Sequence, residues 1–314
     1  MDALKHNGYL LLNIEQDKVE EDRRLFHDYI ANIPEFKSSN RPTDCGDIGP
    51  GRFGALNFAS AFHAPVCASC DEHIYKAARP VLNALAKDLG LRHMQLIPDR
   101  LCYRTQAQPA ESYHYDASYG AEEGDCFFGT IYNLNDRLTQ VFTCVPGSHK
   151  LEADLKGGEY TRQEKTAEYQ KTEQAVQIPP SHALVFFENI VHRVSGAKPP
   201  EPILRKFVGF RLTNSDNEWF GAQNSPLLAT QSALYYKGGK IPPMYPRLYL
   251  VNHVDKLTQF ADRLKPEMLT RYTYKTGKRK GMTICVPKQP PPSLQELDAM
   301  YDETENRFKL QKVV

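Results

Sequence analysis

The sequence has no long hydrophobic run, no excess of either charge and no dense set of cysteines. No stretch approaches the roughly 18 apolar residues of a membrane span, and Tyr9–Ile14 is too short and too soon acidic for a signal peptide. The 39 Lys and Arg residues balance 38 Asp and Glu residues, which argues against a protein built chiefly to neutralise nucleic-acid phosphates. Seven cysteines are an odd number, unlike the even framework of a disulfide-rich secreted domain. We therefore expect a soluble cytoplasmic protein with reduced thiols and no membrane partner.

Internal repeats of 20 to 50 residues are also missing, which excludes a solenoid or a propeller. What is present is an ordinary globular composition, with 41% hydrophobic and 25% charged residues. A chain of 314 residues is long enough for one large domain or two modest ones.

The first part of the chain predicts helices. The apolar run in Gly8–Glu15 is typical of a strand buried on both faces. A helix should follow, capped by Asp17 and ended by Pro34. Apolar residues at helical spacing predict a second helix over Cys67–Leu89, with Gly90 at its C-terminal cap.

Beyond residue 92 the pattern changes to strands. Six short segments are rich in Val, Ile, Phe and Tyr and are separated by turn residues: His93–Thr105, Cys126–Leu134, Gln140–Val145, Ala175–Ile178, Ala183–Phe187 and Ile203–Thr213. This order predicts a mainly β fold with flanking helices, an antiparallel sandwich or barrel for which a jelly roll satisfies the count. We expect residues 1–214 to form this core, with the polar segment Lys150–Gln174 as a surface excursion. Residues 215–314 are predicted to be an extension packed on the core.

The strongest chemical pattern joins His114, Asp116 and His192. In an extended segment, side chains two residues apart share a face, so His114 and Asp116 can occupy neighbouring corners of one metal ion. His192 follows a buried strand and would supply a third corner. Two histidines and one carboxylate leave positions free for a cosubstrate and O2, the arrangement of non-haem Fe(II) oxygenases.

Two further segments extend this pattern. Val145–Lys150 contains a Pro-Gly-Ser-His turn, and Phe186–Arg193 places His192 beyond a strand. Together with His-x-Asp and an arginine on the last core strand, they resemble the phytanoyl-CoA dioxygenase-like branch of the Fe(II)/2-oxoglutarate oxygenases. The resemblance covers roughly residues 8–213. It implies a double-stranded β-helix (cupin-like) core, Fe(II) held by His114, Asp116 and His192, and 2-oxoglutarate and O2 as cosubstrates. Related halogenases replace the carboxylate by a small residue, so Asp116 implies hydroxylation or another oxidation.

The distal carboxylate of 2-oxoglutarate requires a cation, and a guanidinium serves it with two parallel hydrogen bonds. Strand alternation over Ile203–Thr213 places Arg205 and Arg211 on one face and Lys206 on the apolar face. Arg205 lies 13 residues after His192 and best matches the spacing of the family. We predict that Arg205 binds 2-oxoglutarate, with Arg211 as the reserve candidate.

Weaker predictions concern other polar and aromatic residues. Tyr103, Thr130 and Tyr132 lie on core strands, and Thr130 or Tyr132 is a candidate contact for 2-oxoglutarate, with core packing an equal alternative. Three tyrosines beside the triad are candidates for the wall of a substrate pocket: Tyr113, Tyr115 and Tyr119. We interpret His149 as structural rather than as a fourth ligand.

Two compact motifs have an ordinary and a functional interpretation. Four potential zinc ligands fall within eleven residues: His63, Cys67, Cys70 and His73. Structural zinc sites usually draw their ligands from separated segments, so buried reduced thiols are the favoured interpretation. The strip Arg271–Gly281 is basic and aromatic, which fits a solvated loop better than a nucleic-acid contact.

The sequence therefore predicts an Fe(II)- and 2-oxoglutarate-dependent dioxygenase that oxidises a small organic molecule and releases succinate and CO2. Two alternatives are a catalytically silent β-helix scaffold and an oxygenase acting on nucleic acid through residues 271–281. The complete set of His114, Asp116, His192 and Arg205 favours the enzyme, because a scaffold has no need of it.

Overall fold

The computed structural model describes residues 2–33, 54–56, 64–116, 124–150, 163–216, 269–273, 283–287 and 311–313. Tyr119, His63 and the basic residues 275–280 lie outside this part of the chain, so the predictions made for them have no structural counterpart here.

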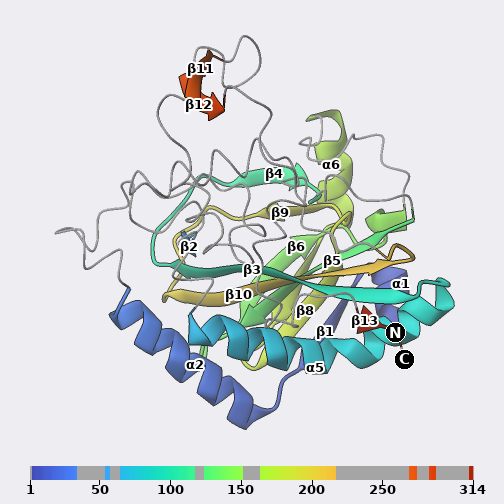
Figure 1. The fold of residues 1–314 in the computed structure, drawn as a ribbon, viewed down its shortest axis with the longest axis horizontal. Coiled ribbons are helices and arrows are strands. Elements are labelled where there is room, and N and C mark those ends of the chain that lie inside the picture. Colours follow the sequence, from blue (N-terminus) through green and yellow to red (C-terminus); the bar gives the residue numbers. More distant parts are fainter. Residues whose placement is uncertain are drawn as a thin grey trace.

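Two antiparallel sheets face each other (Figure 1). The larger sheet has the strand order β1 (Tyr9–Asn13), β8 (His182–Phe187), β5 (Cys126–Asn133), β10 (Ile203–Thr213), β3 (His93–Arg104) and β13 (Gln311–Lys312), and β2 (Ala55–Leu56) also pairs with β3. The smaller sheet has the order β4 (Glu111–His114), β9 (His192–Val194), β6 (Gln140–Cys144) and β7 (Gln174–Ile178). A separate pair is formed by β11 (Leu269–Thr273) and β12 (Thr283–Pro287).

The path of the chain identifies the architecture. From β3 to β10 the strands are placed alternately in the two sheets, except that β6 and β7 follow each other in the smaller sheet. This winding gives β8-β5-β10-β3 facing β4-β9-β6-β7, which is the double-stranded β-helix or jelly roll. The predicted fold class is confirmed, and the six predicted strands are present within one or two residues of their predicted ends.

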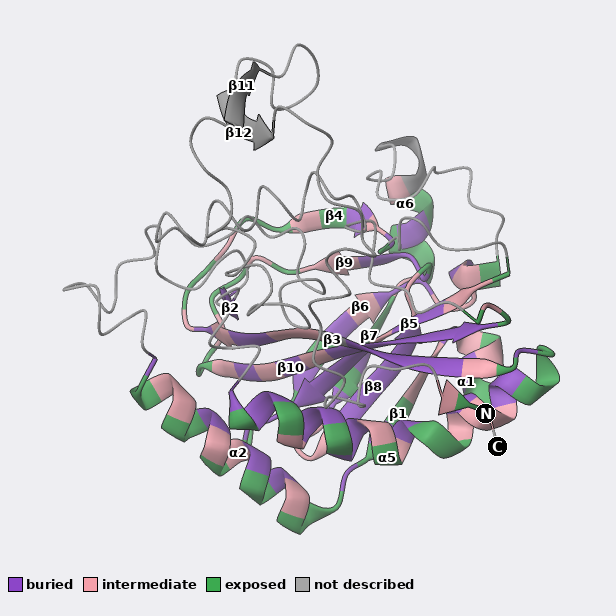
Figure 2. Ribbon diagram, in the orientation of Figure 1, coloured by how far each residue is buried: buried purple, intermediate pink, exposed green. Residues whose placement is uncertain are grey.

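Two helices cover the outer face of the larger sheet, each with its buried side toward the strands (Figure 2). The first is α2 (Gln16–Ala31), which starts after Glu15 without a side-chain cap, so the predicted cap at Asp17 is wrong. The second is α5 (Pro65–Asp88), whose proline occupies the first turn, where its missing N–H costs nothing. A short helix α1 (Asp2–Asn7) precedes β1.

The core beneath α5 confirms the predicted alternation of β10. Leu204, Val208 and Phe210 belong to the hydrophobic cluster shared with the helix. Lys206 faces the same side and is fully buried, with its Nζ 2.9 Å from Asp71 Oδ1 of α5. Lys206 is therefore a core ion pair and not a cosubstrate ligand.

One local prediction is corrected and a second is refined. Strand β1 is not buried on both faces, because the side chain of Leu11 is exposed. Within the described chain β1 pairs only with β8 and lies at the edge of the sheet. The polar segment before β7 contains the helix α6 (Gln163–Thr172), which buries Tyr169. Its low mean hydropathy gives no helical pattern of apolar residues in the sequence. Among its described side chains, Tyr169 is the buried one.

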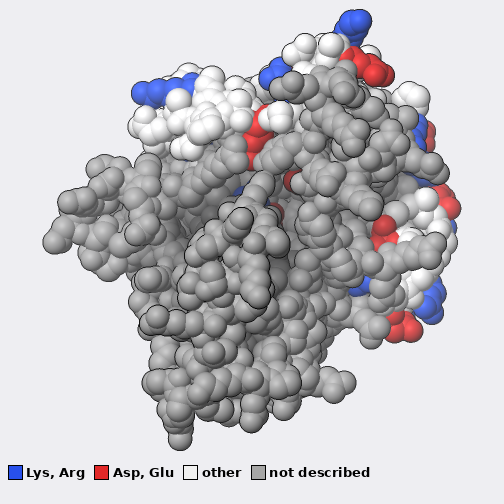
Figure 3. Space-filling view, turned by 90° about the horizontal axis from the view of Figure 1, so that it is seen from above, with Lys and Arg blue, Asp and Glu red and all other residues white. Residues whose placement is uncertain are grey.

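The predicted extension contributes one strand to the core, because β13 pairs with β3 at Met94 and His93. Among the described helices, none has the length and apolar character needed to cross a membrane. On the face shown in Figure 3, the described acidic and basic side chains are interspersed rather than gathered by sign.

Candidate metal centre

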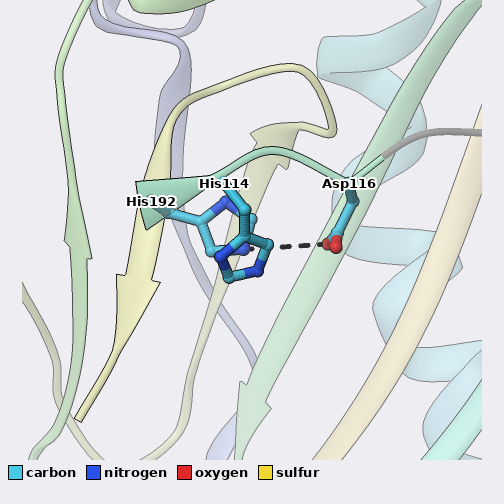
Figure 4. A group of neighbouring side chains, drawn as sticks. All are labelled: His114, Asp116 and His192. Atoms are coloured by element: carbon cyan, nitrogen blue, oxygen red, sulfur yellow. Dashed lines mark ion pairs between the residues drawn. The ribbon is translucent and has the colours of Figure 1, made fainter. Parts of the chain in front are cut away.

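The three predicted metal ligands meet between the sheets (Figure 4). His114 ends β4 and His192 begins β9, and these two residues are direct partners in the antiparallel pair. Their ring centroids are 4.3 Å apart. Asp116 follows two residues after His114 and turns its carboxylate back toward both rings.

The donor atoms are close enough for one ion. One nitrogen of each histidine and one Asp116 oxygen all lie within 4.8 Å of one another, and His192 Nε2 is 3.8 Å from Asp116 Oδ2. Metal bonds of about 2.1 Å place neighbouring donors of an octahedron about 3 Å apart. Small side-chain movements therefore suffice to close the site, with the strands unmoved.

Hydrogen bonds to the backbone orient both imidazoles. His114 Nδ1 lies 2.7 Å from the Ser112 carbonyl oxygen, and His192 Nδ1 lies 3.0 Å from the Ile190 carbonyl oxygen. A carbonyl only accepts, so each Nδ1 carries a proton, and Nε2 is the nitrogen left to bind a metal. This is the arrangement that prepares histidines as metal ligands.

Burial keeps His192 available to a metal. It is flanked by Phe142 and Phe186, with ring centroids at 5.2 and 5.9 Å. Burial lowers the pKa of the His192 imidazole, and this outweighs the opposing effect of the Asp116 carboxylate. The neutral ring is the form that binds metal.

The Pro-Gly-Ser-His turn supports the segment that leads to His192. Gly147 has a φ of +79°, which favours glycine, and the turn continues into the short 3-10 helix Ser148–Lys150. Val191 N donates to Ser148 Oγ at 2.8 Å, and Val145 N donates to the Val191 carbonyl. His149 stacks on Phe187 at 4.7 Å, away from the triad, as expected for a structural residue.

A cavity of about 340 Å³ lies beside the triad, and Arg205 also lines it. Its guanidinium reaches the interior from β10, where Nε donates to Gln140 Oε1 at 2.7 Å. Within the described chain no carboxylate lies within ion-pair distance of it. Burial lowers the pKa of Arg205 to about 10, and the charges of Arg104 and Arg100 act in the same direction.

Gln140 was not predicted as a site residue. Its Nε2 donates to Asn133 Oδ1 at 2.7 Å, to Asn135 Oδ1 at 2.8 Å and to the Leu204 carbonyl at 2.8 Å. These three acceptors fix the orientation of the amide, so its oxygen must point at Arg205. The network therefore positions the guanidinium.

Arg211, the reserve candidate, has a different environment. It lies on the same face of β10 as Arg205, but its Nε donates to Asp125 Oδ2 at 2.7 Å and both side chains are 1% exposed. It does not line the cavity that contains the triad. A guanidinium already paired with a buried carboxylate is a poor ligand for a second one, so Arg205 is the better candidate.

The predictions for Thr130 and Tyr132 are wrong in orientation. Both face the helices: Thr130 pairs with Val208 and Val185 of the outer cluster, and Tyr132 donates its hydroxyl to Asp22 of α2 at 3.1 Å. Ile131, between them, lines the cavity instead. Tyr103 packs against the same outer cluster.

Glu111 is a second residue that the sequence did not indicate. Its Oε2 lies 3.9 Å from His114 Nε2, and it lines the cavity. His114 is the third residue after Glu111, and in a regular strand this spacing places the two side chains on opposite faces. The register shift in the β4–β9 pair brings Glu111 inward.

The Cys-x-x-Cys motif does not form a metal site in the described chain. Cys67 and Cys70 are buried in the core, and burial raises the pKa of Cys70 well above its ordinary value, so its thiol stays protonated. His73 pairs with Asp22 at 2.9 Å. Buried reduced thiols are the interpretation that this geometry supports.

The sequence matches no family model and no curated protein. Solved structures are similar in fold. EctD from S. alaskensis with bound Fe is 18% identical over 67% of this chain and 74% of its own, with a TM-score of 0.47. The non-heme alpha ketoglutarate dependent epimerase SnoN from nogalamycin biosynthesis is 16% identical over 68% and 79%, with a TM-score of 0.46. The carbocyclase SnoK is 11% identical over 69% and 84%, with a TM-score of 0.47. At such low identity, the function has to be argued from the residues of this chain.

Proposed function

We propose that this protein is an Fe(II)- and 2-oxoglutarate-dependent dioxygenase of the phytanoyl-CoA dioxygenase-like type, which oxidises a small organic substrate. One observation carries the proposal. The same cavity is lined by a convergent His-Asp-His group and by a guanidinium that has no carboxylate partner in the described chain.

The donor set fits Fe(II). His114 and His192 each donate from Nδ1 to a backbone carbonyl, which leaves Nε2 as the metal-binding nitrogen, and Asp116 adds a carboxylate oxygen. Two imidazoles and one carboxylate on one side of the ion leave the opposite side free, which suits an oxygenase better than a closed structural site.

The charge of the cavity fits a dianionic cosubstrate. Arg205 is an inward-facing cation whose charge is not neutralised by the amide of Gln140. The distal carboxylate of 2-oxoglutarate would neutralise it through paired hydrogen bonds, while the keto-acid end reaches the metal. Gln140 holds the guanidinium in place before the cosubstrate arrives, which reduces the entropy that binding costs.

Bound iron supplies the activation of O2 and the oxidation of the substrate. The residues of this chain hold the participants and exclude water. Phe142 and Phe186 shield His192, and Ile131 and Phe207 form apolar parts of the cavity wall. The size of the cavity suits a small-molecule substrate beside the cosubstrate.

The test is release of succinate from 2-oxoglutarate by the purified protein with Fe(II) and O2, first alone and then with panels of small organic acids, amino acids and thioesters. We expect slow Fe(II)-dependent release that at least one compound class stimulates. Asp136→Asn, which alters a surface ion pair with Arg23, is the matched control and should behave like wild type. Release that is equal in the Asp116→Ala variant would refute the proposal.

A further inference from the structure

The carboxylate of Glu173 links the two short strands that carry the histidines of the metal centre. Glu173 connects the end of α6 to the start of β7. Arg193 donates to it through both Nε, at 2.6 Å to Oε2, and Nη2, at 2.8 Å to Oε1. The Tyr113 hydroxyl donates to the same Oε2.

The two donors are the chain neighbours of the two histidines. Tyr113 precedes His114, and Arg193 follows His192. The two histidines line the cavity, whereas Tyr113 packs with Val145, Tyr169 and Val191 in a separate cluster. Arg193 also lines the cavity, and its guanidinium reaches Glu173. Glu173 therefore joins β4 to β9 through the residues next to the two histidines.

Backbone pairing alone constrains these strands weakly. Strand β9 has 3 residues and β4 has 4, and their register shifts between Glu111 and His114. A pair this short and irregular has few ladder hydrogen bonds to fix the distance between His114 and His192. Strand β9 is also held by its pairing with β6 on the other side, and side-chain bonds between β4 and β9 add a direct constraint on that distance.

The surroundings of Glu173 show a built cluster. The Arg193 guanidinium lies 5.8 Å from the Tyr113 ring centroid, and Tyr113 packs on Tyr169 of α6 with centroids 5.5 Å apart. Glu173 N donates to the Tyr169 carbonyl at 2.8 Å, which places the carboxylate at the helix end. Hydrogen bonds from Arg193 and Tyr113 lower the pKa of Glu173, the larger share coming from Arg193.

We propose that Glu173 is a positioning residue of the metal centre, which holds His114 and His192 at binding distance by accepting hydrogen bonds from Tyr113 and Arg193. The proposal rests on the metal site proposed above. It also makes α6 part of the support of that site, although none of the described α6 side chains lines the cavity.

The test is calorimetric titration of metal-free protein with Co²⁺. Glu173→Gln keeps the shape of the side chain but removes its charge and one acceptor. We expect the Co²⁺ dissociation constant to rise about tenfold or more, the range typical of groups that orient metal ligands. Tyr113→Phe removes a single hydrogen bond and should raise it less.

Coupling separates positioning from a general loss of stability. If Glu173 acts through Arg193, the double variant Glu173→Gln/Arg193→Gln should bind Co²⁺ no more weakly than Glu173→Gln alone. The matched control is Asp136→Asn, which breaks the Arg23–Asp136 ion pair of 2.5 Å, formed between α2 and the turn after β5. It should leave the dissociation constant unchanged.

The outcomes are distinct. A dissociation constant for Glu173→Gln within twofold of wild type, or fully additive losses in the double variant, would overturn the positioning role alone. Wild-type protein that binds no Co²⁺ would overturn the metal centre as well. If Glu173→Gln fails to fold, Glu173→Asp, which retains the charge but shortens the reach, must raise the dissociation constant at an unchanged unfolding temperature of the metal-free protein.

Discussion

His114 and His192 are direct partners in the β4–β9 pair, and each donates from Nδ1 to a carbonyl oxygen two residues earlier in its own segment. The same local hydrogen bond therefore orients both imidazoles, whose rings lie side by side with centroids 4.3 Å apart. Asp116, two residues after His114, brings a carboxylate oxygen to within 4.8 Å of a nitrogen of each ring.

The two candidate arginines should differ in their effect on cosubstrate binding. Arg205→Ala removes the cavity guanidinium that has no carboxylate partner in the described chain, so the dissociation constant of 2-oxoglutarate should rise by about 100-fold, as for loss of a bidentate charged contact. Arg211→Ala should raise it much less while lowering stability, since it leaves Asp125 buried without its partner. Calorimetric titration of each metal-loaded variant with 2-oxoglutarate measures the two dissociation constants. A larger rise in Arg211→Ala than in Arg205→Ala would transfer the role to Arg211.

Tyr132→Phe tests the orientation of β5. The change removes the hydrogen bond to the buried Asp22 and should lower the free energy of unfolding by about 1–3 kcal/mol. The affinity for 2-oxoglutarate should stay the same, because the ring faces α2 and not the cavity. Denaturant unfolding and a cosubstrate titration distinguish this result from a lost ligand contact, which would weaken binding instead.

Gly129 makes room for the ring that packs against His192. A Cβ at this position would lie 2.5 Å from Phe186 Cζ, and the Phe186 ring centroid lies 5.9 Å from that of His192. Gly129→Ala must displace the Phe186 ring, which packs near His192, at a cost of about 1–3 kcal/mol in unfolding free energy. We expect weaker Co²⁺ binding as well. Gly90→Ala is the comparison: its Cβ meets nothing within 4 Å, so any strain there comes from its φ of +68° and should leave metal binding unchanged.

The buried pair Lys206–Asp71 should matter for stability rather than for activity. Asp71→Asn leaves the fully buried ammonium without a counter-charge and should cost about 3–5 kcal/mol of unfolding free energy. Asp88→Asn, on the same helix, breaks the solvent-exposed pair with Lys5 and should cost about 1 kcal/mol or less. Equal losses in the two variants would show that burial does not govern the strength of this pair.

The sequence was most informative where polarity or length made the pattern unambiguous. Strand β10 contains Arg205, Lys206 and Arg211 among apolar residues, and its predicted alternation agrees with the structure. Strand β5 contains apolar residues on both faces, because Phe128 packs under the helices while Phe127 and Ile131 face the interior. Alternation therefore does not show which face points inward, and both a cosubstrate contact and core packing fit Thr130 and Tyr132 in the sequence; the structure shows core packing.

The two strands that carry the histidines, β4 and β9, are not predicted from the sequence. With 4 residues in β4 and 3 in β9, neither presents a readable period. His114, Asp116 and His192 were found by their chemistry instead. Glu111 and Glu173 were missed because one depends on an irregular register and the other on a contact between segments about 60 residues apart.

The most direct test is a crystal structure determined anaerobically with Fe(II) and 2-oxoglutarate. We predict an iron anomalous peak between His114 Nε2, His192 Nε2 and an Asp116 oxygen, with the distal carboxylate of 2-oxoglutarate on the Arg205 guanidinium. Iron bound at other residues, or a triad that stays empty under saturating iron, would contradict the account.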